Sequence, residues 1–116
     1  MTRELRRARR RQAPEGILVT DAMTGEVVGR VGNLSETGML MMSSTDLVED
    51  ALYQLRFALI DDAGQERTLE LGAHLLWSDG ASAPGQAWTG FRFIGLSAEQ
   101  ARQLRNWVDA PGSHYA

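Results

Sequence analysis

In residues 52–60, 68–78 and 88–94, apolar and polar residues alternate with a period of two, which is typical of half-buried β-strands, while residues 16–20, 27–34 and 39–42 are short apolar or β-branched runs. Turn-forming residues separate such segments, and the short connections favour antiparallel pairing, beginning with a hairpin between the first two segments. The cleanest alternation lies in residues 68–78, with apolar positions at Leu69, Leu71, Ala73, Leu75 and Trp77. The predicted strands are residues 16–20, 27–34, 39–42, 52–60, 68–78 and 88–94.

Near the end of the chain the pattern changes to helical spacing. Ser97 and Gln100 form a capping box, in which each side chain can bond the other residue's backbone N–H. The apolar stripe that follows consists of Ala101, Leu104 and Val108, flanked by Trp107. A Pro-Gly pair ends the pattern, so we predict a helix over about residues 97–109. Together these elements predict a mainly β fold, a six-stranded antiparallel β-barrel with a C-terminal α-helix docked against it.

Charge divides the chain into an arm and a body. Residues 1–11 carry six arginines and one glutamate, a balance of +5, whereas the remaining residues carry six arginines and fourteen acids, a balance of −8. Residues 1–13 also lack an apolar pattern that could be buried, so we expect a flexible basic N-terminal arm. We predict a single domain over residues 14–112 and a short tail over residues 113–116.

Composition argues against several classes of function. The chain has no cysteine, which excludes disulfides, thiolate metal sites and thiol catalysis. No apolar run reaches the roughly 18–20 residues of a membrane span, and no apolar segment follows the N-terminal charges as in an export signal. We therefore expect a cytoplasmic protein. His74 and His114 lack metal ligands at a recognisable spacing, and Ser35 lies outside any nucleophile motif, so we expect no metal, no cofactor and no enzymatic activity.

The arginine cluster is the first candidate for binding. All twelve basic residues are arginine, whose flat guanidinium matches phosphate and stacks on bases. Arg6 and Arg10, or Arg7 and Arg11, are four residues apart, so a helical turn would place either pair on one face, where it could clamp a diphosphate or sandwich a base. The alternative is a solvated basic tail that binds RNA, DNA or acidic lipid without specificity.

The second candidate is the polar stretch Asn33-Leu34-Ser35-Glu36-Thr37-Gly38, at a bend between two predicted strands. Asn33 and Ser35 share one face of an extended chain, so both could bond a nucleobase edge or a phosphate, while Gly38 would let the ligand approach the backbone. The alternative is a plain turn, in which a short polar side chain bonds the backbone and Gly38 adopts a left-handed backbone angle.

Taken together, the two stretches resemble the motifs of the PilZ family of cyclic di-GMP receptors. An Arg-x-x-x-Arg element, Arg7-Ala8-Arg9-Arg10-Arg11, precedes the Asn-x-Ser-x-x-Gly element of residues 33–38. The resemblance continues in Leu76-Trp77 at a strand end, in Gly90-Phe91-Arg92-Phe93 of the last strand and in the closing helix, so it covers most of the chain. It implies a six-stranded β-barrel whose N-terminal arm folds over the ligand.

The resemblance also implies roles for individual residues. In this family the paired arginines engage phosphates and stack on guanine, the Asp or Asn and the Ser of the second motif bond guanine or its phosphate, and the Gly keeps the surface open. Carried over, the residues that bind cyclic di-GMP are Arg7, Arg11, Asn33, Ser35 and Gly38. Arg6 and Arg10 satisfy the same spacing, and the first pair is preferred because Arg11 lies nearer the first strand. Trp77 is a further candidate for the pocket wall, the alternative being a tryptophan of the barrel core.

These expectations describe a non-enzymatic cyclic di-GMP receptor. The ligand would order the basic arm and so create a new surface for a downstream partner protein. Two alternatives remain: a barrel of the same fold that binds proteins but no nucleotide, and a general nucleic-acid binder that uses its arm. The acidic body argues against an extensive nucleic-acid footprint, so we expect no specific nucleic-acid partner.

Overall fold

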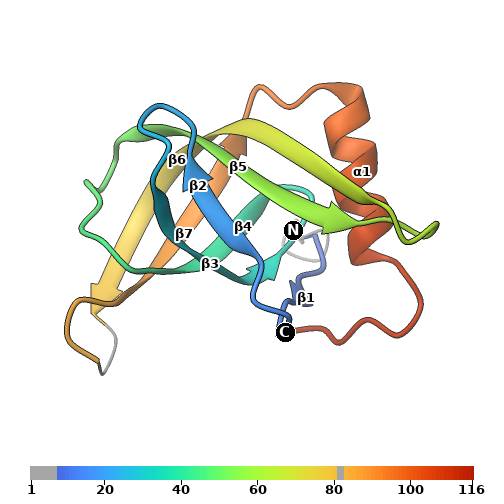
Figure 1. The fold of residues 1–116 in the computed structure, drawn as a ribbon, viewed down its shortest axis with the longest axis horizontal. Helices are drawn as coiled ribbons and strands as arrows, with labels where there is room; N and C mark the ends of the chain where they lie inside the picture. The colour runs from blue at the N-terminus through green and yellow to red at the C-terminus, as the bar shows by residue number, and fades with distance from the viewer. Residues whose placement is uncertain (1–7, 81–82) are drawn as a thin grey trace, which may run out of the picture.

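The computed structural model describes residues 8–80 and 83–116, which form seven β-strands and one α-helix (Figure 1). The strands are β1 (Arg11–Gln12), β2 (Leu18–Asp21), β3 (Val27–Leu34), β4 (Gly38–Ser43), β5 (Leu52–Ile60), β6 (Glu66–Gly80) and β7 (Ala87–Ile94). The helix is α1 (Ala98–Val108). Each of the six predicted strands is present, and those predicted over residues 27–34 and 52–60 have the predicted bounds.

Six of the strands close into a barrel. The sheet order is β1-β3-β2-β5-β6-β7-β4, and a further pairing between β3 and β4 completes the ring. All of these pairs are antiparallel, which confirms the predicted six-stranded antiparallel barrel and its opening hairpin of β2 and β3. The additional strand β1 pairs with Asn33 and Leu34, beyond the part of β3 that pairs with β2.

The core fills the barrel with the apolar side chains that the alternation predicted. Buried residues of the two longest strands are Leu55, Phe57 and Leu59 in β5 and Leu69, Leu71, Ala73 and Leu75 in β6. Phe91 and Phe93 of β7 are buried as well, with the Phe93 ring 6.4 Å from that of Phe57. Met39 and Met41 of β4 fill the interior too, as expected for adaptable core residues.

The alternation fails at Trp77, and the core interpretation of this residue is wrong. The pairing of β6 with β7 shifts between Leu75 and Trp77, which inserts one extra residue into β6. Because side chains alternate along a strand, one extra residue moves the next side chain to the other face. Trp77 is therefore 44% exposed on the outer surface of the barrel.

Helix α1 lies at one end of the barrel, beside the turn between β5 and β6 (Figure 1). Its predicted capping box is present: Ser97 Oγ accepts from the Gln100 N–H, and Gln100 Oε1 accepts from the Ser97 N–H. Leu104, Trp107 and Val108 form its buried face. This confirms the predicted terminal helix. No helix within the described residues has the length and apolar character to cross a membrane.

The end of the expected arm and the C-terminal tail lie side by side. Arg6 and Arg7 lie outside the described residues, whereas Arg11–Gln12 form β1 and Ala13 is buried. The tail, residues 113–116, runs along the other edge of β1, and its end lies beside β1 in Figure 1. The short strand therefore has β3 on one side and the tail on the other.

Candidate functional site

Arg9 and Arg10 precede β1 and Arg11 begins it, and the three side chains point to different sides of the chain. Neighbouring side chains alternate in an extended backbone, so Arg10 faces one way and the other two face the opposite way. Arg10 Nη1 donates a hydrogen bond to Asn33 Oδ1 at 3.1 Å. The guanidinium carbon of Arg11 instead lies 4.0 Å from the ring centroid of Trp107 in α1, and its Nη1 donates to the Trp107 carbonyl at 2.6 Å.

Arg10 and Asn33 stand at one end of a surface hollow of about 300 Å³. In the strand register, Asn33 lies opposite Leu40, Leu40 opposite Gly90, and Gly90 opposite Trp77. One row of residues thus crosses β3, β4, β7 and β6. The complete lining is Arg10, Asn33, Met39, Leu40, Leu76, Trp77, Gly90 and Phe91. The hollow combines an apolar floor with a cation and an amide at one end and an indole at the other.

Gly90 allows the indole of Trp77 to lie against the barrel. A Cβ atom at this position would lie 2.2 Å from Trp77 Nε1 and 2.4 Å from Cε2, far inside van der Waals contact. Any side chain at residue 90 would therefore push the indole away from β7. The sequence pattern around Gly90 resembles the family motif, but its contact with Trp77 depends on the bulge in β6 and was not predicted.

The bend after Asn33 is held by its own serine. Ser35 is fully buried, and its Oγ accepts hydrogen bonds from the backbone N–H groups of Thr37 and Gly38, each at 3.1 Å. The Ser35 N–H in turn donates to the Gly38 carbonyl at 2.9 Å. The Ser35 hydroxyl therefore stabilises the turn through these hydrogen bonds, and Ser35 does not line the hollow.

Gly38 is required by packing between strands. A Cβ atom here would lie 2.3 Å from the Phe91 carbonyl oxygen of β7 and 3.5 Å from Arg10 Nη2. Its backbone φ is not among the positive values, so the plain-turn alternative is wrong about a left-handed angle at Gly38, although its bond from a short polar side chain to the backbone is present at Ser35. The missing side chain instead lets β4 approach β7 and leaves room for the Arg10 guanidinium at the edge of the hollow.

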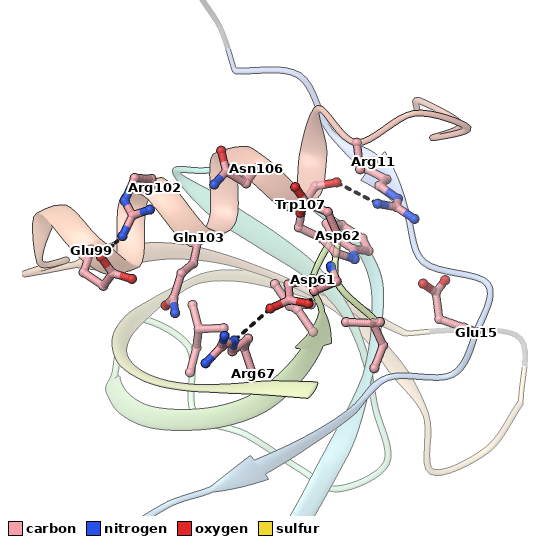
Figure 2. A pocket seen from close by; sticks show the side chains of 15 residues that line it. Arg11, Glu15, Asp61, Asp62, Arg67, Glu99, Arg102, Gln103, Asn106 and Trp107 are labelled. Atoms are coloured by element: carbon pink, nitrogen blue, oxygen red, sulfur yellow. Dashed lines mark hydrogen bonds and ion pairs between the residues drawn. The ribbon is translucent and has the colours of Figure 1, made fainter. Parts of the chain in front are cut away.

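A larger cleft of about 810 Å³ lies on the other side of β1, between α1 and the β5–β6 turn (Figure 2). Its arginines are engaged locally: Arg67 Nε contacts Asp61 Oδ2 at 2.8 Å, Arg102 pairs with Glu99, and Arg11 is held by Trp107. The hydrogen bond from Arg67, with those from two backbone N–H groups, lowers the pKa of Asp61. Arg10 and Arg11, although adjacent in sequence, thus line two separate depressions.

Within residues 8–80 and 83–116, no group of three or more His, Cys, Asp or Glu side chains is arranged to hold a metal ion. His74 Nε2 lies 2.6 Å from Asp50 Oδ1, a contact that joins β6 to the loop before β5.

The family model described as "PilZ domain" matches residues 4–110, which is nearly the whole chain. The chain belongs to the PilZ domain family. This confirms the resemblance seen in the sequence. PilZ domain proteins are typically non-catalytic receptors. No curated protein matches the chain.

Three solved structures share the PilZ fold with this chain. The PilZ domain of Escherichia coli YcgR with c-di-GMP has 22% identity and a TM-score of 0.62, over 85% of each chain. YcgR in complex with c-di-GMP has 24% identity and a TM-score of 0.66, covering 85% of this chain and 42% of that one. The Bacillus subtilis inhibitor of motility, MotI/DgrA, has 15% identity and a TM-score of 0.71, covering 90% and 48%. This PilZ chain therefore spans about half the length of MotI and less than half of YcgR.

The structure brings together only part of the predicted PilZ site. Arg10, Asn33 and Trp77 line the hollow, and Gly38 lies at its edge. Ser35 is buried in the bend, and Arg11 lies on Trp107 in the other depression. Arg6 and Arg7 fall outside the described residues. Leu40 and Gly90 of the hollow were not predicted, because only the register of β4 and β7 places them beside Asn33 and Trp77.

Proposed function

We propose that this PilZ domain is a non-enzymatic receptor for cyclic di-GMP that passes the signal to a partner protein. The observation that carries the proposal is the hydrogen bond between Arg10 and Asn33 at the end of a hollow walled by Trp77. It is supported by membership of the PilZ family and by the likeness to the YcgR structures that contain c-di-GMP.

The chemistry of the hollow suits a guanine nucleotide. A guanidinium matches phosphate oxygens or the acceptor edge of guanine, and an amide can both donate to and accept from a base. The indole of Trp77 offers a flat face on which a purine can stack. A hollow of about 300 Å³ lies at the small end of ligand sites, so the ligand needs a further element to cover it. We propose that the arginine-rich residues before Arg10 cover the bound ligand.

We propose that the binding pair of arginines is Arg6 and Arg10, in place of the register of Arg7 and Arg11. The position of Arg10 at Asn33 supports this choice, as does the engagement of Arg11 with Trp107. Arg6 shares the required spacing with Arg10. Asn33 then contacts the ligand directly. Ser35 and Gly38 act indirectly, by fixing the bend and the close approach of β4 to β7.

The proposed signal is the ordering of the arm over the ligand. Six arginines near one another repel, and the two phosphates of the dinucleotide neutralise that repulsion when the arm folds over them. A segment that becomes ordered on binding creates a surface that a partner protein can recognise, and the ligand must offset the entropy that ordering costs.

Isothermal titration with cyclic di-GMP tests the assignment of Arg10. We expect Arg10→Ala to weaken binding by about ten- to a hundredfold, as for the loss of a charge-assisted hydrogen bond. Arg11→Ala should cost less, because Arg11 acts only by holding β1 against α1. Arg102→Ala, in α1 and outside the lining of the hollow, is the matched control and should bind as wild type. A larger loss in Arg11→Ala than in Arg10→Ala would restore the register of Arg7 and Arg11.

The alternative of a PilZ barrel that binds proteins but no nucleotide has one observation in its favour. Ser35, a motif residue expected at the ligand, is fully buried and bonded within its own bend. Wild-type protein that gives no heat with cyclic di-GMP at high protein concentration would favour this alternative. GTP and GMP serve as controls for specificity in the same titration.

A further inference from the structure

The C-terminal tail pairs with the segment that carries Arg10. Residue Arg11 lies opposite Tyr115 in an antiparallel bridge. On either side of this bridge, the Gln12 N–H donates to the His114 carbonyl at 2.8 Å, and the Ala116 N–H donates to the Arg10 carbonyl at 2.9 Å. The tail thus adds a strand-like partner to the edge of β1 that faces away from β3.

Side chains reinforce this pairing. Arg9 Nη2 lies 2.7 Å from Asp109 Oδ1, and the guanidinium carbon of Arg9 lies 4.4 Å from the ring centroid of Tyr115. The Tyr115 hydroxyl donates to the Val108 carbonyl at 2.8 Å, which fastens the tail to the end of α1. Each exposed contact is weak alone, but together they tie residues before β1 to the tail and the helix.

A two-residue strand with one neighbour is a marginal structure, so the second neighbour matters for its order. Holding both edges of residues 10–12 fixes the alternation of side chains, which directs Arg9 and Arg11 towards the helix and tail and Arg10 towards Asn33. Among the described residues, the lining of the hollow includes none from the tail. The tail therefore touches the back of the arginine segment and does not plug the hollow.

We infer that the C-terminal tail, chiefly through Tyr115, is a positioning element that sets Arg10 at the hollow before the ligand arrives. The inference rests on the proposed binding of cyclic di-GMP and identifies a residue outside the binding motif on which that binding depends. An arm that is already ordered at residues 10–12 loses less conformational freedom on binding than one that is ordered by the ligand throughout. Removing the tail contacts should weaken binding without altering any group that touches the ligand.

The test compares Tyr115→Ala, Tyr115→Phe and His114→Ala in the full chain. Tyr115→Ala should weaken cyclic di-GMP binding by about three- to tenfold, because the ordering cost returns to the binding step. Tyr115→Phe keeps the ring beside Arg9 and should recover part of the affinity. His114→Ala removes an exposed side chain but keeps the carbonyl that Gln12 bonds, so it should bind as wild type. Amide exchange of Gln12, measured without ligand, should quicken most in Tyr115→Ala, less in Tyr115→Phe and not in His114→Ala.

A double-mutant comparison separates positioning from a general structural effect. If the tail acts through Arg10, Tyr115→Ala should cost little further affinity in an Arg10→Ala background. Equal losses in both backgrounds, or no loss in Tyr115→Ala, would overturn the inference while leaving the receptor proposal intact. If the wild type binds no cyclic di-GMP, the receptor proposal fails by itself. The tail inference is then judged by the exchange of the Gln12 amide, and an unchanged rate in Tyr115→Ala overturns it.

Discussion

Because Gly90 has no Cβ, the indole of Trp77 can lie against β7 and form one wall of the hollow. In Gly90→Ala the new Cβ would lie 2.2 to 2.8 Å from ring atoms of the Trp77 indole, which is too close for van der Waals contact. Because Trp77 is partly exposed, we expect the indole to swing outward while the barrel stays folded. Loss of a base-stacking face costs about 1–3 kcal/mol, so cyclic di-GMP binding should weaken by about five- to a hundredfold in a titration.

The control for this variant lies in the same region of the sheet. A Cβ at Gly80 in β6 meets nothing within 4 Å, so Gly80→Ala should keep the affinity of the wild type. Trp77→Ala should reproduce the loss seen in Gly90→Ala. Undiminished binding by Gly90→Ala would show that the ligand does not use the indole.

Some residues of the candidate site could be predicted from the sequence, and the orientation of others could not. The motif identified Asn33, and it restricted the arginines to two registers. Sequence position alone favoured Arg7 and Arg11, but the side that Arg10 and Arg11 each face depends on which edge of the extended segment meets β3 and which meets the tail. For Ser35 the local sequence did indicate the alternative of a plain turn, and its buried hydroxyl accepts from the backbone N–H groups of that bend.

Among the elements, the turn between β5 and β6 carries a prediction about pH. Asp61 Oδ1 accepts from the N–H groups of Ala63 and Gln65, and its Oδ2 accepts from Arg67 Nε. The bond from Arg67 is the main cause of the lowered pKa of Asp61. A carboxyl whose pKa is lower in the folded state stabilises the fold above its unfolded value of about 4, and this contribution is lost as the pH falls through the folded pKa.

Removing Arg67 should therefore move the pKa of Asp61 upward. A carbon-detected NMR titration of the Asp61 carboxyl in Arg67→Gln should show a midpoint closer to that of an ordinary aspartate. Arg56→Gln, which loses a pair with Glu70 instead, is the control and should leave the midpoint in place. If the midpoint is the same in Arg67→Gln and wild type, the backbone N–H groups alone hold the carboxylate.

The elements themselves were largely predictable, because they follow from local periodicity. Strand β5 has alternating buried positions and β3 is a largely buried run. Clear turn residues flank both strands, so their bounds agree with the prediction. Helix α1 was marked by its capping box. Strand β1 was not predicted, since Arg11 and Gln12 have no β-forming pattern and gain their strand conformation from β3 and the tail. Trp77 faces outward because of the bulge in β6, and no turn residue in the sequence indicates that bulge.

At the scale of the whole molecule, the closure of the barrel and the position of the C-terminal tail determine what surrounds the hollow and Arg10. The barrel closes on itself through β3 and β4, so it gives the hollow a rigid base across four strands. Among the described residues, Arg10 is the arginine that lines this hollow, whereas Arg9 lies on Tyr115 of the tail and Arg11 on Trp107 of the helix. The C-terminal tail meets β1, so the end of the chain lies against the segment that carries Arg10.

A ligand that binds only the folded barrel must stabilise it as a whole. At a concentration one hundred times its dissociation constant, cyclic di-GMP should add about 2.7 kcal/mol to the free energy of unfolding. For a domain of this size, that corresponds to a rise in Tm on the order of 10 °C, measurable by calorimetry or circular dichroism. GMP at the same concentration should give no comparable rise, and the rise with cyclic di-GMP should shrink in Arg10→Ala. An unchanged wild-type Tm at every cyclic di-GMP concentration would contradict the receptor proposal and favour a PilZ barrel that binds only proteins.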